Sequence, residues 1–241
     1  MVSVCIATYN GEKYIKEQID SILCQLGKDD EIVVSDDHST DGTLTVISQI
    51  NDERIHVFLN ENSCSGKHVK HLQISRNFFN AIRHSRGDII FLSDQDDIWM
   101  ENKVAFCLKE LQTCDLVIHN GEIVNGQKED MHTSLWPKGF RFRNFLLIPH
   151  TYMGCCMAFR RDMLNFFFPV PDKILVHDYW IGIICELCGH VRYIPQPLIK
   201  YRLHDGNNSK TSNNNTLNKI QYRIYTMWHV LLRYVWYRFC R

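Results

Sequence analysis

The sequence predicts an α/β protein in which a mostly parallel central sheet is flanked by helices and followed by a C-terminal amphipathic helix. Strand-like and helix-like segments alternate through the first hundred residues, an order that favours parallel strands joined by crossover helices. Residues 89–92 are wholly apolar, as expected for a strand covered on both faces. A chain of 241 residues has the length of one large domain or of one domain with an appendage.

The elements of the first hundred residues follow from apolar spacing and turn residues. Ile15, Ile19 and Ile22 share one face of a helix expected over about 13–26. Polar residues at 39–41 can cap a second helix that reaches Ile50, and Asp41 is most simply part of that helix start. A third helix is expected over 73–85. Apolar, β-rich runs predict strands at 2–8, 31–35, 54–60 and 88–93.

The second half of the chain is less regular. A helix is expected over 177–189 because an acidic residue opens the segment and Gly189 closes it. A hairpin is possible around Asn125-Gly126 in a polar, turn-rich segment. Strands are predicted at 114–120, 154–159, 191–195 and 197–203. We therefore expect one domain over 1–206 with halves 1–100 and 101–206, a polar linker over 207–218 and a helix over 219–241.

The charge of the chain is balanced overall but divided between two parts. Lys plus Arg and Asp plus Glu number 27 each, which is not the composition of a protein that binds nucleic acid by general phosphate neutralisation. No acidic residue follows Gly206, so this segment carries +6 and residues 1–205 carry −6. The six basic residues are Lys210, Lys219, Arg223, Arg233, Arg238 and Arg241.

The ten cysteines favour a reducing compartment. Several lie in apolar runs that are typical of a protein core, which suits free thiols in a cytosol. Cys185 and Cys188 form one CxxC pair without a second pair or a His pair at zinc spacing, so buried apolar side chains are favoured over metal or redox chemistry. We expect no secretory signal peptide and no confident membrane-spanning helix, and hence a cytoplasmic protein.

Candidate functional residues follow the predicted parallel strands, because ligands bind at the carboxyl ends of strands in such sheets. Asp36 and Asp37 follow the second strand, where either could also be a turn or cap residue. Asp94, Asp96 and Asp97 follow the fourth strand. Three carboxylates within four residues repel one another, and a divalent cation such as Mg²⁺ or Mn²⁺ relieves that repulsion.

Phosphate-binding glycine loops are absent from the sequence. Neither GxGxxG nor GxxxxGK[ST] follows the first strand, which argues against dehydrogenases and P-loop kinases. A nucleotide is therefore expected to be held by carboxylates and a metal.

Three segments of the sequence resemble a known family. SVCIATYNGEKYIKEQIDSIL (3–23), VVSDDHSTDGT (33–43) and NFFNAIRHSRGDIIFLSDQDDIW (77–99) are similar to the inverting glycosyltransferases usually called family two. The SDQDDIW version resembles the rhamnosyltransferase-like branch of bacterial surface-polysaccharide pathways. The similarity runs from Val2 to about Asn208. It implies the GT-A fold, a nucleotide-sugar donor and a divalent metal, Mn²⁺ or Mg²⁺.

The resemblance implies roles for matching residues in the first half. Asp94 and Asp96 match the family's DxD pair, in which Asp96 aligns with the direct metal ligand and Asp94 with a ribose or metal-water contact, while Asp97 is an adjacent support. Asp36 and Asp37 would contact the base or ribose. The donor-binding residues expected in all are Thr8, Tyr9, Glu12, Asp36, Asp37, Arg76, Asn77, Asp94 and Gln95, with Arg76 and Asn77 near the diphosphate.

The resemblance also implies residues around the acceptor. Asp178 aligns with the catalytic base, although its family partner is usually Glu and here is His177; taken alone, Asp178 could be a helix N-terminal acid. Gly154 and Cys155 resemble the strand end that faces the acceptor. Trp180 could form an acceptor platform or belong to the core. His204 resembles a late motif residue near the metal or diphosphate, which adds it to Asp94 and Asp96 as expected metal ligands.

The implied reaction is the transfer of a sugar, with inversion, to a hydroxyl of a glycan or lipid-linked acceptor. Asp178 would take the hydroxyl proton and the metal would stabilise the departing diphosphate. Two alternatives are a sugar nucleotidyltransferase on a similar fold and a non-catalytic nucleotide-sugar binding module. The first usually carries a Gly- and Lys/Arg-rich loop that TYNGEKYI lacks, and the intact acidic residues argue against the second.

The C-terminal segment 219–241 has two faces when drawn as a helix. Its basic residues fall within one arc, and the opposite arc is apolar or aromatic. This pattern is typical of a helix that lies on an anionic membrane surface, which would make the protein peripheral at the cytoplasmic face of the membrane. The alternative is a helix that packs on the acidic body or on a partner subunit. The expected apolar arc contains Ile224, Tyr225, Trp228, Leu231, Leu232, Val235, Trp236 and Phe239.

Overall fold

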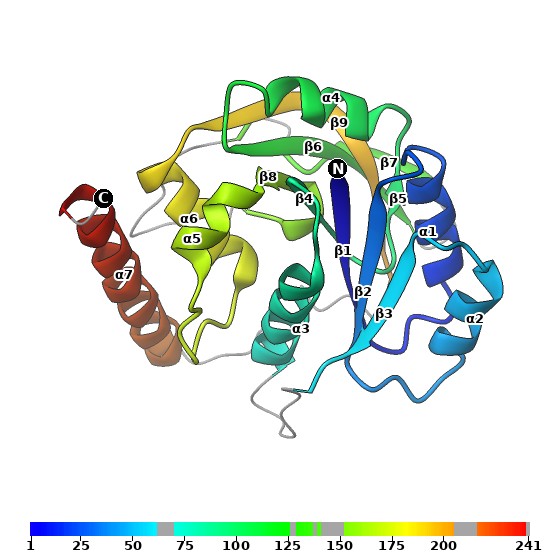
Figure 1. Ribbon diagram of the computed structural model, residues 1–241, viewed down its shortest axis with the longest axis horizontal. Helices are drawn as coiled ribbons and strands as arrows, with labels where there is room; N and C mark the ends of the chain where they lie inside the picture. Colours follow the sequence, from blue (N-terminus) through cyan, green and yellow to red (C-terminus); the bar gives the residue numbers. More distant parts are fainter. Residues whose placement is uncertain (62–69, 126–128, 137–138, 141–151, 205–215, 240–241) are drawn as a thin grey trace.

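The computed structural model describes residues 1–61, 70–125, 129–136, 139–140, 152–204 and 216–239 (Figure 1). Its strands are β1 (Val2–Thr8), β2 (Glu31–Asp36), β3 (Ile55–Leu59), β4 (Ile89–Ser93), β5 (Ile98–Trp99), β6 (Leu116–Asn125), β7 (Asp130–Ser134), β8 (Met157–Arg160) and β9 (Val191–Leu203). Its helices are α1 (Ile15–Leu23), α2 (Thr43–Ile50), α3 (Lys70–His84), α4 (Lys103–Glu110), α5 (Leu164–Phe167), α6 (His177–Cys188) and α7 (Thr216–Phe239), with short 3₁₀ turns η1 (Gly154–Cys156) and η2 (Arg161–Met163).

Within the described residues, one nine-stranded sheet runs in the order β3-β2-β1-β4-β8-β6-β9-β5, and β7 pairs with β6 off this path. The expected parallel pairing holds for β3, β2, β1 and β4, and again between β6 and β9. Strand β8 is antiparallel to both of its neighbours, so the sheet is mixed beyond β4. The carboxyl ends of β1, β2 and β4 therefore meet at one edge, as predicted.

Helices cover both faces of the sheet, which confirms the predicted α/β arrangement (Figure 1). On one face, Ile90 and Phe159 pack with residues of α3, α5, α6 and α7. On the other face, Val4 and Phe91 pack with residues of α1, α2 and α4. Neighbouring strand residues alternate between the two cores because successive side chains point to opposite faces of a strand. Cys185 and Cys188 are buried on the inner side of α6, in agreement with the core interpretation.

The structure changes several expected boundaries. Segments 191–195 and 197–203 form the single strand β9, with an irregular register near Pro197 that reflects the missing proline N–H. Residues 154–156 form η1, and only the rest of the predicted strand is extended. Strand β5 and helix α4 lie in a segment where no element was expected. The hairpin is present as β6 and β7, with its tip at 126–128 outside the described residues.

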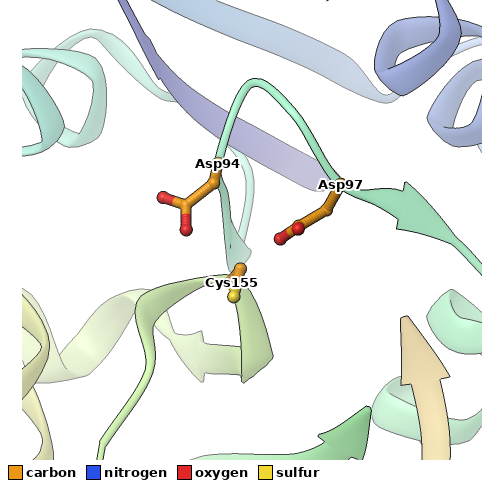
Figure 2. Close-up of side chains that lie close together, drawn as sticks. All are labelled: Asp94, Asp97 and Cys155. Atoms are coloured by element: carbon orange, nitrogen blue, oxygen red, sulfur yellow. The ribbon is translucent and has the colours of Figure 1, made fainter. Parts of the chain in front are cut away.

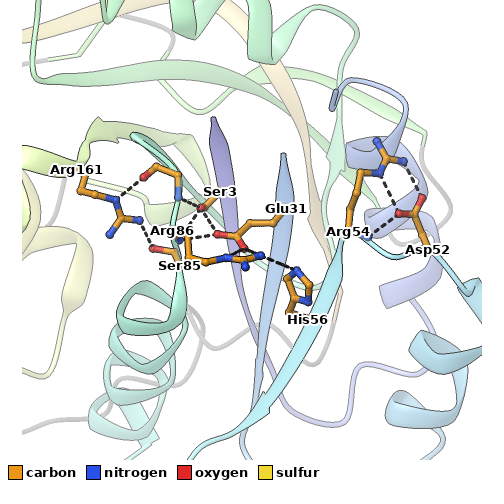
Figure 3. A network of polar contacts seen from close by, with 9 residues as sticks. Ser3, Glu31, Asp52, Arg54, His56, Ser85, Arg86 and Arg161 are labelled. Carbon is orange, nitrogen blue, oxygen red and sulfur yellow. Dashed lines mark hydrogen bonds and ion pairs between the residues drawn. The ribbon is translucent and has the colours of Figure 1, made fainter. Parts of the chain in front are cut away.

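The opposite, amino ends of the strands are joined by a polar network (Figure 3). The buried Glu31 carboxylate accepts from Ser3 Oγ at 2.6 Å and pairs with the Arg86 guanidinium at 2.8 Å. Arg161 donates to the carbonyl of Gly87 and to Ser85 Oγ, which ties η2 to the start of β4. These contacts satisfy polar groups at the end of the sheet that carries no candidate ligand.

Helix α7 is present and begins at Thr216, so the last residues of the expected linker are helical, while 207–215 and 240–241 lie outside the described residues. It lies beside α6 at one end of the molecule (Figure 1). Its Arg223 and Arg233 are half-buried against the body, whereas Arg238 is exposed. Among the described helices, none has the length and apolar character needed to cross a membrane.

Candidate active site

The acidic residues after β4 form a cluster with Cys155 (Figure 2). Asp94 follows β4, Asp97 precedes β5, and Cys155 lies in η1; one ligand atom from each lies within 4.8 Å of the others. Asp97 is only 1% exposed, and its Oδ2 has no hydrogen-bond partner among the described residues. A buried carboxylate oxygen without a partner is costly unless something else binds it.

The electrostatics of this cluster fit a hard divalent cation. Burial, assisted by the neighbouring Asp96 carboxylate, raises the pKa of Asp94 to about 7. Burial and the other two carboxylates raise the pKa of Asp97 well above its usual range. A hydrogen bond with Cys156, together with burial, raises the pKa of the Cys155 thiol and so disfavours its thiolate form. The oxygens of the carboxylates are the donors that Mg²⁺ and Mn²⁺ prefer.

Asp96 and His204 lie together beside this cluster. Asp96 Oδ2 is 2.8 Å from His204 Nε2, and the His204 ring lies over that of Tyr14, with centroids 4.7 Å apart. The structure thus brings the expected ligands Asp96 and His204 into contact and adds Asp97 to the candidate ligands. Sequence spacing alone places Asp97 in the loop but does not reveal its unpaired oxygen.

The end of β1 is tied to the acidic loop by Gln95. Its Oε1 accepts from Thr8 Oγ1 at 2.7 Å and from the Tyr9 N–H at 2.9 Å, and its Nε2 donates to the Tyr9 carbonyl at 3.2 Å. A Cβ on Gly11 would lie 2.6 Å from Gln95 Oε1, so glycine is required for this approach. The Tyr9 side chain is 53% exposed at this edge and is free to contact a ligand.

The acidic residues after β1 and β2 have different surroundings. Asp36 is fully buried and accepts from Ser39 N–H and Oγ at 2.8 and 2.6 Å, so it holds a turn and its expected contact with a donor is not available in this structure. Glu12 Oε2 accepts the Gly42 N–H at 3.0 Å, which fixes the start of α2. Asp37 is partly exposed and accepts from Asn60 Nδ2 at 2.9 Å, so it still faces the edge where a nucleotide would lie.

Helix α3 contributes Arg76 and Asn77 at the same edge. The buried Asn77 donates from Nδ2 to the Thr8 carbonyl at 3.1 Å. This bond places α3 against the end of β1, next to the residues that Gln95 holds. Arg76, the preceding residue, is partly exposed.

Asp178 lies in the first turn of α6 and faces η1. Its carboxylate accepts the Tyr179 N–H at 2.6 Å and the backbone N–H of Gly154. Burial, with a contribution from the Asp94 carboxylate, raises its pKa to about 7 from an ordinary value of 3.8. Asp178 and the acidic cluster, far apart in the sequence, therefore both adjoin η1, the first at Gly154 and the second at Cys155.

His177 fills the space that Gly154 leaves open. Its ring stacks on Phe78 with centroids 4.0 Å apart, and a Cβ on Gly154 would lie 2.6 Å from its Nε2. Burial lowers the pKa of His177 to about 3, so the ring is neutral. The absence of a side chain at residue 154 thus lets the N-terminus of α6 approach η1.

Trp180 belongs to the core, and the proposed acceptor platform is corrected. Its side chain is fully buried, and its indole N–H donates to the Phe167 carbonyl at 3.2 Å. Residues 177–188 form a helix, so Trp180 points away from the side on which Asp178 lies. Gly154 and Cys155 are also buried, at the floor between Asp178 and the cluster.

The family is decided by a match that covers most of the chain. The profile of the family described as Glycosyl transferase family 2 matches residues 3–168. The chain belongs to glycosyl transferase family 2. Relatives of this family member include an uncharacterized glycosyltransferase, alr2836, from Nostoc sp. It is 28% identical over 222 residues, which are 86% of this chain and 66% of that protein.

Two further relatives have more specific names. The chain is 28% identical to the UDP-Glc:alpha-D-GlcNAc-diphosphoundecaprenol beta-1,3-glucosyltransferase WfaP of Escherichia coli, over 77% of this chain and 71% of that one. It is 27% identical to the dTDP-rhamnosyl transferase RfbG of Shigella flexneri, over 84% and 72% of the two chains. This family member thus spans about two thirds of the length of the relatives it matches.

Solved structures share the fold. TarS of S. aureus, residues 1–349 in complex with UDP-GlcNAc, has a TM-score of 0.69 at 20% identity, covering 96% of this chain and 66% of that one. The mannosyltransferase PcManGT of Pyrobaculum calidifontis, in complex with GDP-Man and Mn²⁺, has a TM-score of 0.61 at 17% identity, covering 96% and 73%. These similarities establish a GT-A glycosyltransferase fold for this family member.

Arg202 is a site residue that the sequence did not reveal. Its buried guanidinium donates from Nε to the Asp96 carbonyl and from a terminal nitrogen to Glu17 Oε2, both at 2.9 Å, and it lies over the Tyr14 ring. Its backbone N–H donates to Asp97 Oδ1 at 3.1 Å. Arg202 therefore holds the acidic loop in place from β9.

Lys103 is the second such residue. It is fully buried in α4, its Nζ donates to the Cys155 carbonyl at 2.9 Å, and the ammonium lies 4.0 Å from the Trp99 ring centroid. Burial lowers the pKa of this ammonium, while the Asp97 carboxylate favours its charged form, so the charges of Lys103 and the acidic cluster support each other. No sequence pattern singles out one lysine for burial, because its partners come from β5 and η1.

Replacing the Arg202 guanidinium is expected to weaken metal binding. In Arg202→Met, the Asp96 carbonyl and Glu17 lose their charged donor, and the Mn²⁺ dissociation constant should rise about tenfold or more. Glu17→Gln removes only the ion pair with Arg202. It should change the Mn²⁺ dissociation constant less, and the stability of the protein should stay nearly normal. Isothermal titration calorimetry measures both, and Arg86→Met at the opposite end of the sheet is the matched control. Unchanged Mn²⁺ affinity in folded Arg202→Met would show that the acidic loop keeps its geometry without this contact.

Proposed function

We propose that the chain catalyses the transfer of a sugar from a nucleoside-diphosphate sugar to a hydroxyl of a glycan or lipid-linked acceptor, with inversion at the anomeric carbon. The observation that carries this proposal is that the acidic cluster and Asp178 both adjoin η1, close enough for the Asp94 carboxylate to contribute to the raised pKa of Asp178. The acidic cluster offers carboxylates to a cation that a diphosphate also binds, and Asp178 offers a base. The names of the relatives, which specify UDP-Glc and dTDP-rhamnosyl donors, support this class of substrate.

The metal in this proposal is Mn²⁺ or Mg²⁺. Asp94, Asp96 and Asp97 would hold it through oxygen atoms, with His204 beside them. When bound, such a cation supplies positive charge where negative charge develops on the departing diphosphate. Arg202 holds the acidic loop and Lys103 holds η1, so that little reorganisation is needed when the donor arrives.

The base in this proposal is Asp178. In an in-line displacement, the acceptor oxygen forms a bond to the anomeric carbon as the bond to the diphosphate oxygen breaks, and the hydroxyl proton passes to Asp178. A pKa of about 7 leaves a substantial fraction of the carboxylate ionised at neutral pH and still basic enough to accept that proton. The neutral His177 adds no charge that would lower its basicity.

The remaining candidate residues would bind the nucleotide. Tyr9 and Asp37 present side chains at the carboxyl ends of β1 and β2, and Arg76 lies on the facing helix. Thr8, Glu12, Asn77 and Gln95 would act mainly by fixing the loops that form this edge, since their polar groups bond to neighbouring loops.

Product analysis tests this function. The chain is incubated with uridine, thymidine and guanosine diphosphate sugars and Mn²⁺, and the released nucleotide is identified. Transfer, or slow hydrolysis without an acceptor, gives a nucleoside diphosphate, whereas a sugar nucleotidyltransferase consumes or forms pyrophosphate. A donor that raises the melting temperature but is never cleaved would support a non-catalytic binding module instead.

We also propose that the protein works at the cytoplasmic face of a membrane and that α7 touches the lipid. The outward face of α7 is apolar over a length of about 30 Å. It is therefore a continuous apolar surface and not a set of single, scattered apolar side chains. It carries no acidic residue, and Arg238 lies exposed at its edge. A lipid-linked diphosphate in the name of the relative WfaP and free thiols in the described chain support this location. The outward side chains are Ile220, Ile224, Trp228, Leu231, Leu232, Val235, Trp236 and Phe239.

Flotation with liposomes tests the lipid contact. The full chain should float with vesicles that contain phosphatidylglycerol, and the triple variant Trp228→Gln, Leu232→Gln, Val235→Gln should lose about a hundredfold in binding, because three apolar side chains no longer enter the bilayer. Phe106→Gln, which changes an exposed aromatic residue on α4, is the matched control. Equal flotation of the triple variant would contradict the proposal. If the wild type does not float but forms a dimer, and the triple variant is a monomer, the apolar face of α7 binds a second copy of the chain instead of lipid.

A further inference from the structure

The inward face of α7 contacts the helix that carries Asp178. Val230 is 1% exposed within the core shared with α6, and Met227 Sδ lies 3.9 Å from Tyr179 Oη. The Arg233 guanidinium donates to the Pro169 carbonyl in the loop before α6. This packing holds the middle of α7 against α6 and the loop before it.

A further contact from α7 reaches the N-cap residue of α6, two residues before the proposed base. The Val176 N–H donates to Tyr222 Oη at 3.2 Å, and Val176 is the N-cap residue of α6, followed by His177 and Asp178. The first N–H groups of a helix have no partner within it, and here no N-cap side chain supplies one. Tyr222 therefore provides from another helix an acceptor that α6 lacks.

Tyr222 is suited to this role because its hydroxyl stays neutral. Its burial, with the Asp178 carboxylate contributing, raises the pKa of the phenol above its ordinary value of 10. A neutral phenol can accept the Val176 N–H without placing a second negative charge beside Asp178.

We propose that Tyr222 is a positioning residue for Asp178, so that α7 belongs to the catalytic unit and is not a separable membrane appendage. The inference rests on the proposed function for the role of Asp178, but the contact itself is independent of it. An error of about 1 Å in the position of a base is enough to slow a reaction substantially. In this proposal the outward apolar face of α7 contacts lipid, and its inward Tyr222 positions Asp178.

The test compares Tyr222→Phe with Tyr234→Phe, a matched change in the same helix, in the full chain. We expect Tyr222→Phe to lower the rate of nucleoside diphosphate release about tenfold, with the donor KM and the Mn²⁺ affinity within twofold of wild type. Tyr234→Phe should behave as wild type. In an Asp178→Asn background, Tyr222→Phe should have no further effect, because the group it positions is already removed.

Amide hydrogen exchange gives a readout that needs no activity. The amides at the start of α6, from Val176 to Tyr179, should exchange about tenfold faster in Tyr222→Phe than in wild type or Tyr234→Phe. Unchanged exchange at these amides would overturn the proposed contact. Faster exchange with full turnover would overturn the positioning role alone. Faster exchange together with no cleavage of any donor by the wild type would count against the proposed function and leave the contact established.

Discussion

Asp178→Asn is expected to lower the rate of nucleoside diphosphate release by 10²–10⁴-fold, the range over which a positioned general base contributes. The amide oxygen can still accept from Tyr179 and Gly154, so the start of α6 should keep its place. Donor and Mn²⁺ binding, measured by calorimetry, should therefore stay within about twofold of wild type. Asp172→Asn, an exposed change in the segment before α6, is the control. Turnover close to wild type in Asp178→Asn would remove this residue from the mechanism.

The raised pKa of Asp178 also fixes the direction of two pH effects. The base acts only when ionised, so turnover should rise with pH on passing about 7, and a cation on the cluster should move the midpoint lower because the Asp94 carboxylate contributes to the rise. Because the folded-state pKa lies above the unfolded value, the free energy of unfolding falls as the pH rises from about 4 to about 7, and the loss levels off above that range. Relative to wild type, metal-free Asp178→Asn should thus be more stable at pH 8 than at pH 5, by at most about 3 kcal/mol. An equal difference in melting temperature at both pH values would contradict a raised pKa.

Removing a carboxylate in or beside the acidic cluster is the second change with a large expected effect. Asp96→Ala should lower Mn²⁺ affinity by at least about a hundredfold and turnover by about a thousandfold, since a metal ion contributes several kcal/mol of charge stabilisation. Chelation of divalent cations should abolish turnover in the wild type, and Mn²⁺ or Mg²⁺ should restore it. Asp97→Asn should also weaken binding, because its buried oxygen has no other partner.

Glu101→Ala is the matched control for this series. Glu101 is an exposed carboxylate just after β5, close in sequence to the cluster but outside it. Its loss should leave Mn²⁺ affinity and turnover unchanged. If Asp96→Ala behaves like Glu101→Ala in both measurements, the acidic cluster is not the metal site.

The sequence predicted the parts of the fold that depend on local pattern. Strands β1, β2 and β4 and helix α6 follow from apolar runs and spacing, and the order of these elements brings residues after β1, β2 and β4 to one edge of the sheet. Strand β8 runs antiparallel within this sheet, and nothing in its short apolar run specifies that direction. Direction depends on the path of the chain between elements and on partners far away in the sequence.

The sequence points to site residues that belong to a local motif. It does not reveal residues whose position depends on partners from distant parts of the chain. Asp94 lies in the candidate metal cluster and Asp178 at the start of α6, and the metal and base roles that the family resemblance implies for them stay predictions. Arg202 and Lys103 were missed because a buried cation is stable only with partners from other elements, which a sequence read locally does not display. Asp36 was ambiguous for the same reason, since Ser39 supplies the bonds that make it a turn residue.

The most direct test of the central claim compares nucleoside diphosphate release by wild type, Asp96→Ala and Asp178→Asn, with one donor at saturating Mn²⁺. The account predicts that the wild type releases the diphosphate and that Asp96→Ala releases it about a thousandfold more slowly. It predicts that Asp178→Asn binds the donor normally but cleaves it at least about a hundredfold more slowly. Cleavage by Asp178→Asn at the wild-type rate, or normal donor cleavage by Asp96→Ala, would contradict it.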